Sequence, residues 1–130
     1  MRASTEFVRT ATAALGEINS ALDPIRQGDL TKVKFYAQYE PTQGQLDATQ
    51  TGPDKILLGI YNTQPRPTIV VFESSLRQVP TDLSIITKDV LDHEINQHYF
   101  GLNHTVREPT KQSGCSAACH KCAGCPYMYK

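Results

Sequence analysis

The chain has 130 residues, of which 39% are hydrophobic and 20% are charged, a composition typical of a globular protein with a core of its own. Its 13 basic and 13 acidic residues give a formal net charge of zero without long blocks of like charge, so nothing favours binding to nucleic acid or to a membrane surface. No apolar run is long enough to span a bilayer, and residues 1–22 lack the apolar segment of a secretory signal. We therefore expect one cytoplasmic domain with at most a small appendage.

The first third of the chain predicts a helix, a strand and a loop. Ser4 or Thr5 is placed to cap the helix, and Pro24 is expected to end it. Between them, apolar residues recur at helical spacing at Phe7, Val8, Ala11, Leu15, Ile18 and Leu22. Apolar and polar residues alternate over 33–39, which indicates a strand. The Pro, Gly, Thr, Gln and Asp residues of 41–54 indicate a loop.

Two apolar strands and a second helix are predicted next. Residues 56–61 form a short apolar run, and residues 68–72 are β-branched and aromatic, as in buried strands. A second helix is expected to open with Thr81 as its cap and to continue through a histidine-rich segment. Gly101 is a suitable end for this helix, since glycine tolerates a left-handed backbone. The polar residues 105–114 resemble a linker.

The histidine-rich segment is the strongest functional signal. Residues 93–104 read His-Glu-Ile-Asn-Gln-His-Tyr-Phe-Gly-Leu-Asn-His and hold three of the four histidines. From His98 onward the pattern is H-x-x-G-x-x-H, and His93-Glu94 lies just upstream. This nearly matches the zinc-protease signature H-E-x-x-H-x-x-G-x-x-H, except that His93 and His98 are five residues apart where the signature has four. The segment therefore predicts a metal site, against the alternative of ordinary surface and core histidines.

The extra residue leaves two possible ligand arrangements. On a regular helix, a gap of four leaves two side chains about 40° apart, whereas a gap of five leaves them roughly 140° apart. A single-turn π-bulge at Asn96-Gln97 would absorb one residue and let His93 and His98 face the same ion. Alternatively, Glu94 and His98 are four residues apart and would bind a metal together with His104, as two histidines and one carboxylate. In that second arrangement Glu94 is no longer available as a base.

The chain resembles the minimal zincin-like metallopeptidases, a family of small bacterial proteins, over roughly residues 5–104. The similar blocks are an opening helix around Glu6-Phe7-Val8, then Ile56-Leu57-Leu58-Gly59-Ile60-Tyr61, Pro67-Thr68-Ile69-Val70-Val71-Phe72, Val90-Leu91-Asp92-His93-Glu94 and Phe100-Gly101-Leu102. The resemblance implies an α+β fold with a small mixed β-sheet, an N-terminal helix, an active-site helix and one catalytic zinc. It also implies that His93, His98 and His104 are the metal ligands and that Glu94 is the general base. If the strand at 68–72 lies at the edge of the sheet, we expect it to pair with an extended peptide substrate.

The four cysteines lie together near the end of the chain. Cys115, Cys119, Cys122 and Cys125 fall within eleven residues, and pairs with the spacing Cys-x-x-Cys let two sulfurs face one metal. A structural zinc is the leading interpretation, with an iron–sulfur cluster as the alternative and free or disulfide-bonded thiols as the third. The tail resembles that of the archaemetzincins, which carry a cysteine-bound structural zinc, in composition but not in spacing.

These observations predict a zincin-like metallopeptidase domain over residues 1–108 and a Cys-rich metal-binding tail over 109–130. The expected function is zinc-dependent hydrolysis of peptide bonds, with a peptide or protein substrate and no nucleic-acid or membrane partner. One alternative is a catalytically inactive zincin fold that serves as a metal-binding or regulatory module, and another is an Fe–S protein whose functional part is the tail. In each case the tail is a candidate surface for a protein partner.

Overall fold

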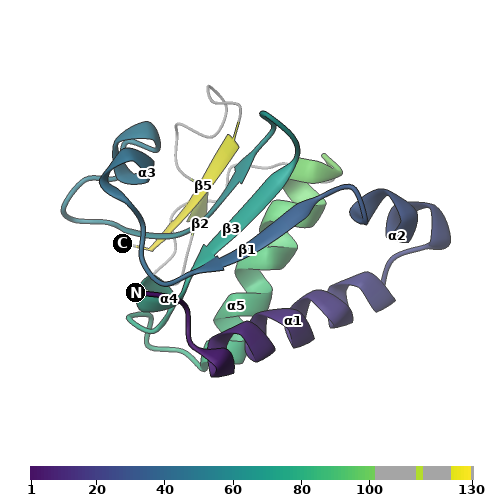
Figure 1. Cartoon of the computed structure of the whole chain (residues 1–130), viewed down its shortest axis with the longest axis horizontal. Coiled ribbons are helices and arrows are strands. Elements are labelled where there is room, and N and C mark those ends of the chain that lie inside the picture. The colour runs from purple at the N-terminus through teal and green to yellow at the C-terminus, as the bar shows by residue number, and fades with distance from the viewer. Residues whose placement is uncertain (102–113, 116–123, 130) are drawn as a thin grey trace.

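The computed structural model describes residues 1–101, 114–115 and 124–129. These residues form helices packed around a five-stranded sheet with the strand order β1-β3-β2-β5-β4 (Figure 1). The strands are β1 (Lys34–Gln38), β2 (Ile56–Asn62), β3 (Thr68–Phe72), β4 (Gly114–Cys115) and β5 (Gly124–Tyr129). β1 runs parallel to β3, and the other neighbouring pairs are antiparallel. The predicted α+β fold with a small mixed sheet and an N-terminal helix is therefore confirmed.

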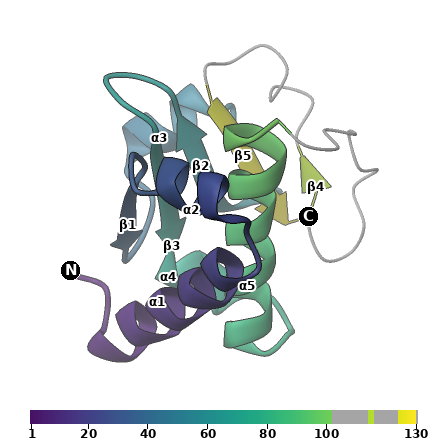
Figure 2. The same cartoon turned by 90° about the vertical axis from the view of Figure 1, so that its right-hand side faces the viewer.

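Helices cover the two faces of the sheet unequally. The long helices α1 and α5 lie on one face, and the short α3 lies on the other (Figures 1 and 2). The helices are α1 (Thr5–Ser20), α2 (Pro24–Leu30), α3 (Gln43–Ala48), α4 (Glu73–Leu76), α5 (Leu83–Asp92) and the π-helix η1 (His93–Tyr99). None of the helices in the described part of the chain has the length and apolar content needed to cross a bilayer.

Capping residues explain where the first two helices begin. The Ser4 hydroxyl accepts a hydrogen bond from the backbone N–H of Phe7 and caps α1, as predicted. α1 already ends at Ser20, and Pro24 begins α2 instead of closing the first helix. Pro24 suits that position because the first helical residue needs no intrahelical hydrogen bond to its nitrogen, and Asp23 supplies the cap.

Three local details differ from the sequence prediction. The segment 41–54 is not all loop, because Thr42 and Gln45 form a reciprocal capping box that opens α3. α5 is capped by Asp82, whose carboxylate accepts hydrogen bonds from the two amides that follow Leu83, and not by Thr81. The short helix α4 directly after β3 was not predicted.

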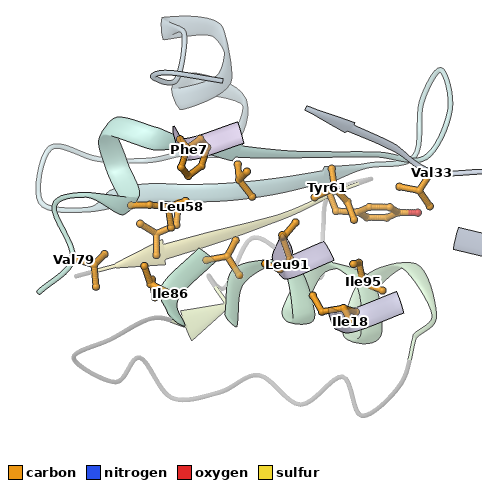
Figure 3. Packing of buried hydrophobic residues seen from close by; sticks show 14 of the residues in the cluster. Phe7, Ile18, Val33, Leu58, Tyr61, Val79, Ile86, Leu91 and Ile95 are labelled. Atoms are coloured by element: carbon orange, nitrogen blue, oxygen red, sulfur yellow. The ribbon is translucent and has the colours of Figure 1, made fainter. Parts of the chain in front are cut away.

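The larger part of the core lies between the sheet and the pair α1 and α5. Figure 3 shows side chains from both layers interleaving there, including Phe7, Leu58, Leu91 and Ile95, all buried. Gly59 on β2 lets α5 approach closely: a Cβ at this position would lie 2.7 Å from Val90 Cγ1. The helix that carries the histidines is thereby held directly against the sheet.

The position of β3 corrects one expectation. This strand lies between β1 and β2, so both of its edges are already hydrogen-bonded and it cannot receive a substrate peptide. Its β-branched sequence reflects burial, since its last four residues are all buried. Within the described residues the outer strands of the sheet are β1 and β4.

Part of the predicted tail adds strands to this sheet. β5 pairs antiparallel with β2, with a shift of register between Leu57 and Gly59, and β4 pairs with β5. η1 lies against both β2 and β5, so the end of the chain returns beside the histidine-bearing helix. The predicted linker over 105–114 lies outside the described residues except for Gly114, which begins β4, and the division of the chain at residue 108 stays a prediction.

A buried carboxylate fixes the start of α1 to α4. Glu73 is 3% exposed; its Oε1 accepts a hydrogen bond of 2.6 Å from Ser4 N, and its Oε2 accepts bonds of 2.8 Å from Ser4 Oγ and 2.9 Å from Arg77 Nε. Burial alone raises the pKa of Glu73, but the bonds from Ser4 and then Arg77 outweigh it, so the pKa lies below its ordinary value of 4.5. The ionised carboxylate is therefore the form that the fold stabilises.

Replacing Glu73 with glutamine is expected to destabilise the fold at neutral pH by about 2 kcal/mol, because charge-assisted bonds to a buried group are lost. Since the folded pKa lies below the unfolded one, the wild-type advantage is present above pH 4.5 and is lost as the pH falls through the folded pKa. Urea unfolding of both proteins at pH 7 and near the folded pKa measures this difference. Glu6→Gln is the control, because Glu6 is exposed and reaches Arg77 only at 3.5 Å. An equal loss of stability at both pH values would contradict the assignment.

Candidate metal centre

The segment that carries the histidine motif is a π-helix. α5 continues without a break into η1, which spans His93–Tyr99 (Figure 2). Phe100 N donates a hydrogen bond of 2.9 Å to Ile95 O, five residues back, which is the π-helical pattern. The extra residue of the motif is thus absorbed by the helix, as in the first of the two predicted arrangements. The π-helical stretch is longer than the single turn expected at Asn96-Gln97.

This register brings two predicted ligands together. His93 Nε2 and His98 Nε2 are 3.1 Å apart, and the two ring centroids are 4.7 Å apart with the rings at 63° to each other. Two nitrogens bound to the same tetrahedral zinc at its usual bond length lie about 3.3 Å apart. The imidazole nitrogens therefore already have nearly the separation that one ion requires.

Glu94 completes the group. Its side chain is fully buried, and its Oε1 lies 3.9 Å from His93 Nε2. One ligand atom from each of His93, Glu94 and His98 lies within 4.8 Å of the others, so this group could hold a metal ion. The alternative arrangement, with Glu94 and His98 as ligands, was predicted for a regular helix. In the π-helical register one ligand atom from each of His93, Glu94 and His98 lies close enough to share an ion, so both arrangements stay predictions.

Aromatic contacts anchor the far end of η1. Tyr99 Oη donates a hydrogen bond of 2.9 Å to the carbonyl oxygen of Asp29 in α2. The ring of Tyr99 lies 6.3 Å from that of Tyr61 on β2. The guanidinium of Arg26 lies 5.7 Å from the ring of Phe100. Gly101, with a φ of 67°, ends the helix in the left-handed conformation, as predicted.

Two ionisable neighbours have shifted pKa values. Burial, and then the proximity of Tyr99 and Glu94, raises the pKa of the Tyr61 hydroxyl above its ordinary value. Burial also raises the pKa of Asp92, opposed by Lys88 and by a hydrogen bond of 2.9 Å from Asn96 Nδ2. Tyr61 stays a neutral hydroxyl close to the group formed by His93, Glu94 and His98. The apolar run at 56–61 includes this residue, but only the folded structure shows it to be a neighbour of η1.

The remaining predicted ligands lie at the end of the chain, where the structure describes only some of the residues. His104, Cys119 and Cys122 lie outside the described residues. Cys115 and Cys125 lie on β4 and β5, and their backbones pair with Tyr127 and Tyr61, respectively. The cysteine-bound metal therefore stays a prediction.

Comparisons of this chain with models of known protein families, with curated proteins and with solved structures match none of them.

Deletion of Gln97 is expected to leave metal binding intact. The shortened sequence contains H-E-x-x-H with the usual gap of four, and an α-helix then places the two histidines about 40° apart. Because a π-helical turn accommodates one surplus residue, its loss should leave the flanking contacts of Tyr99 and Phe100 in place. Elemental analysis after zinc loading measures the metal, and the thermal midpoint reports the fold.

Deletion of Lys88 is the matched control for this experiment. It removes one residue from the regular helix α5 and rotates everything that follows by about 100°. We expect this variant to lose both metal and stability. If the Gln97 deletion lost as much metal and thermal stability as the Lys88 deletion, the π-helical turn would do more than accommodate one surplus residue.

Proposed function

We propose that the chain is a zinc-dependent peptidase whose catalytic group lies on η1. The observation that carries the proposal is the π-helical register, which aligns His93 Nε2 and His98 Nε2 at 3.1 Å with the buried Glu94 beside them. A histidine pair with an adjacent buried carboxylate is the donor set that zinc hydrolases use. The resemblance to the minimal zincin-like metallopeptidases supports the same assignment.

Each residue of the group has a separate role in this proposal. His93 and His98 bind the zinc, and His104 takes the third ligand position of the motif. A zinc ion held by these residues would polarise the scissile carbonyl and lower the pKa of the attacking water. Glu94 accepts the proton of that water and passes it to the nitrogen of the departing amine, so that one peptide bond is exchanged for a carboxylate and an amine.

The Cys-rich tail has a second, structural role in the proposal. Cys115, Cys119, Cys122 and Cys125 bind a zinc ion, or an iron–sulfur cluster, in a reducing compartment such as the cytoplasm. The antiparallel pairing of β5 with β2 supports a tail that stabilises the domain, because it connects this part of the chain to the sheet against which η1 packs. In this role the four cysteines bind the metal through their deprotonated sulfurs.

A cleavage assay on the full chain tests the function. Purified protein loaded with zinc is incubated with an unfolded polypeptide such as denatured casein, and new amino termini are counted with an amine-reactive dye. We expect cleavage that stops when a chelator removes the zinc and returns when zinc is added. Protein that binds zinc through the histidine group but releases no new amino termini would overturn the peptidase proposal and leave a metal-binding module.

A further inference from the structure

One edge of the sheet offers unpaired backbone groups. β1 is the outermost strand on its side of the described sheet, with β3 as its only described partner (Figures 1 and 2). Lys34 N donates a hydrogen bond of 2.9 Å to the carbonyl oxygen of Pro67, at the start of β3. Backbone groups in a strand alternate in direction, so Lys34, Tyr36 and Gln38 bond to β3. The N–H and C=O groups of Phe35 and Ala37 therefore point away from the sheet.

This strand lacks two of the usual protections against pairing with another chain, and Lys34 is its only charged residue. It contains no proline, and its pairing with β3 runs without a bulge. Apolar side chains are exposed on both faces of the edge. Tyr36 is 55% exposed on one face, and Val8 is 44% exposed on the other, beside an apolar groove of about 120 Å³ that Phe35 and Ala37 also line. Such an edge is a template for strand addition.

We propose that the occupant of this edge is β1 of a second copy of the same chain, paired antiparallel about a two-fold axis at Tyr36. The two sheets then continue into one another. In this register Phe35 lies opposite Ala37 of the second copy, and Ala37 lies opposite Phe35 of the second copy. Each of these pairs exchanges two backbone hydrogen bonds, because all four residues point outward. Shifting the register by two residues would leave only one outward pair facing another.

Side-chain complementarity favours the second copy over an unrelated peptide. In the centred register a large ring, Phe35, lies next to the small Ala37 on the face that α1 covers. On the other face Lys34 lies opposite Gln38 of the second copy, and Glu40 follows two residues beyond the end of β1, within reach of a long side chain. Lys34 and Glu40 are both exposed, and neither forms an ion pair within the described part of the chain. Because the dimer is two-fold symmetric, this contact between opposite charges occurs twice.

The proposed interface is independent of the metal group. η1 packs against β2 and β5, whereas β1 is separated from β2 by β3. Dimer formation therefore leaves the surroundings of His93, Glu94 and His98 unchanged, whatever reaction they support.

Sedimentation velocity of the full chain over a concentration series tests the proposal. We expect the wild type to sediment as a reversible dimer. Lys34→Glu or Glu40→Lys alone places like charges across both ends of the strand pair and should raise the dimer dissociation constant about tenfold. The double variant restores opposite charges and should return the dissociation constant to near the wild-type value. Raising the salt concentration should reduce the differences among these proteins.

The control is Arg9→Glu, which makes a similar charge change on the side of α1 that faces Ser84 and Lys88 of α5, away from β1. It should leave the dissociation constant unchanged, and thermal melting shows that every variant is folded. A wild type that stays monomeric over the whole series would overturn the proposal. A dimer in which both single variants weaken association but the double variant does not restore it would overturn the antiparallel register.

Discussion

Glu94→Gln is expected to keep its zinc and to lower kcat for peptide hydrolysis by about a hundredfold to ten-thousandfold, the usual contribution of a general base. Glutamine has the size of glutamate, so the buried site around residue 94 keeps its packing. The amide, however, cannot accept the proton of the attacking water. Because the change removes a function exercised in the transition state, kcat should fall while KM changes little. Elemental analysis and steady-state kinetics on one preparation measure both properties.

Two outcomes would contradict the assigned role of Glu94. If the variant loses zinc, the carboxylate is a ligand, as in the arrangement of two histidines and one carboxylate. If it keeps full activity, the proton is accepted elsewhere. Glu6→Gln is a suitable control, since Glu6 is an exposed glutamate on α1 and makes the same chemical change far from η1.

His93→Ala is expected to weaken zinc binding at the η1 group by more than about a hundredfold. Loss of a residue that only orients a ligand already costs up to that factor, and His93 is itself a ligand in this proposal. Its Nε2 lies 3.1 Å from that of His98, so one remaining imidazole cannot replace the pair. Competition with a fluorescent zinc chelator measures the affinity. His98→Ala should behave alike, although His98 is only half-buried and its loss leaves a smaller cavity.

Cys122→Ser separates the two predicted metals. We expect this variant to lose the metal of the tail and to keep that of the histidine group, whereas His93→Ala and His104→Ala do the reverse. Zinc and iron are both counted by elemental analysis, which also distinguishes a structural zinc from an iron–sulfur cluster. Full metal content in the histidine variants would eliminate the catalytic metal centre.

Much of the local structure could be predicted because its causes are local. The start of α1 follows from the Ser4 hydroxyl, and the end of η1 follows from the conformational freedom of Gly101. The close approach of His93 and His98 could also be predicted, since a five-residue gap satisfies one ion only if the helix widens. α3 was missed because its polar residues resemble a loop, and only the capping box of Thr42 and Gln45 distinguishes it.

The sequence by itself therefore determined the α+β character of the chain, the strands β1, β2 and β3, the helices α1 and α5, and the helical segment that brings His93, Glu94 and His98 together. Only the tertiary structure decided that β3 is internal, that β5 returns beside η1, and that β1 is one of the two outer strands of the described sheet. The physical reason is the range of the interactions. Helix caps, apolar periodicity and ligand spacing act between residues a few positions apart, whereas strand order depends on which apolar faces pack together across the whole chain. An apolar run such as that of β3 specifies burial on both faces, but not which strands lie on either side of it.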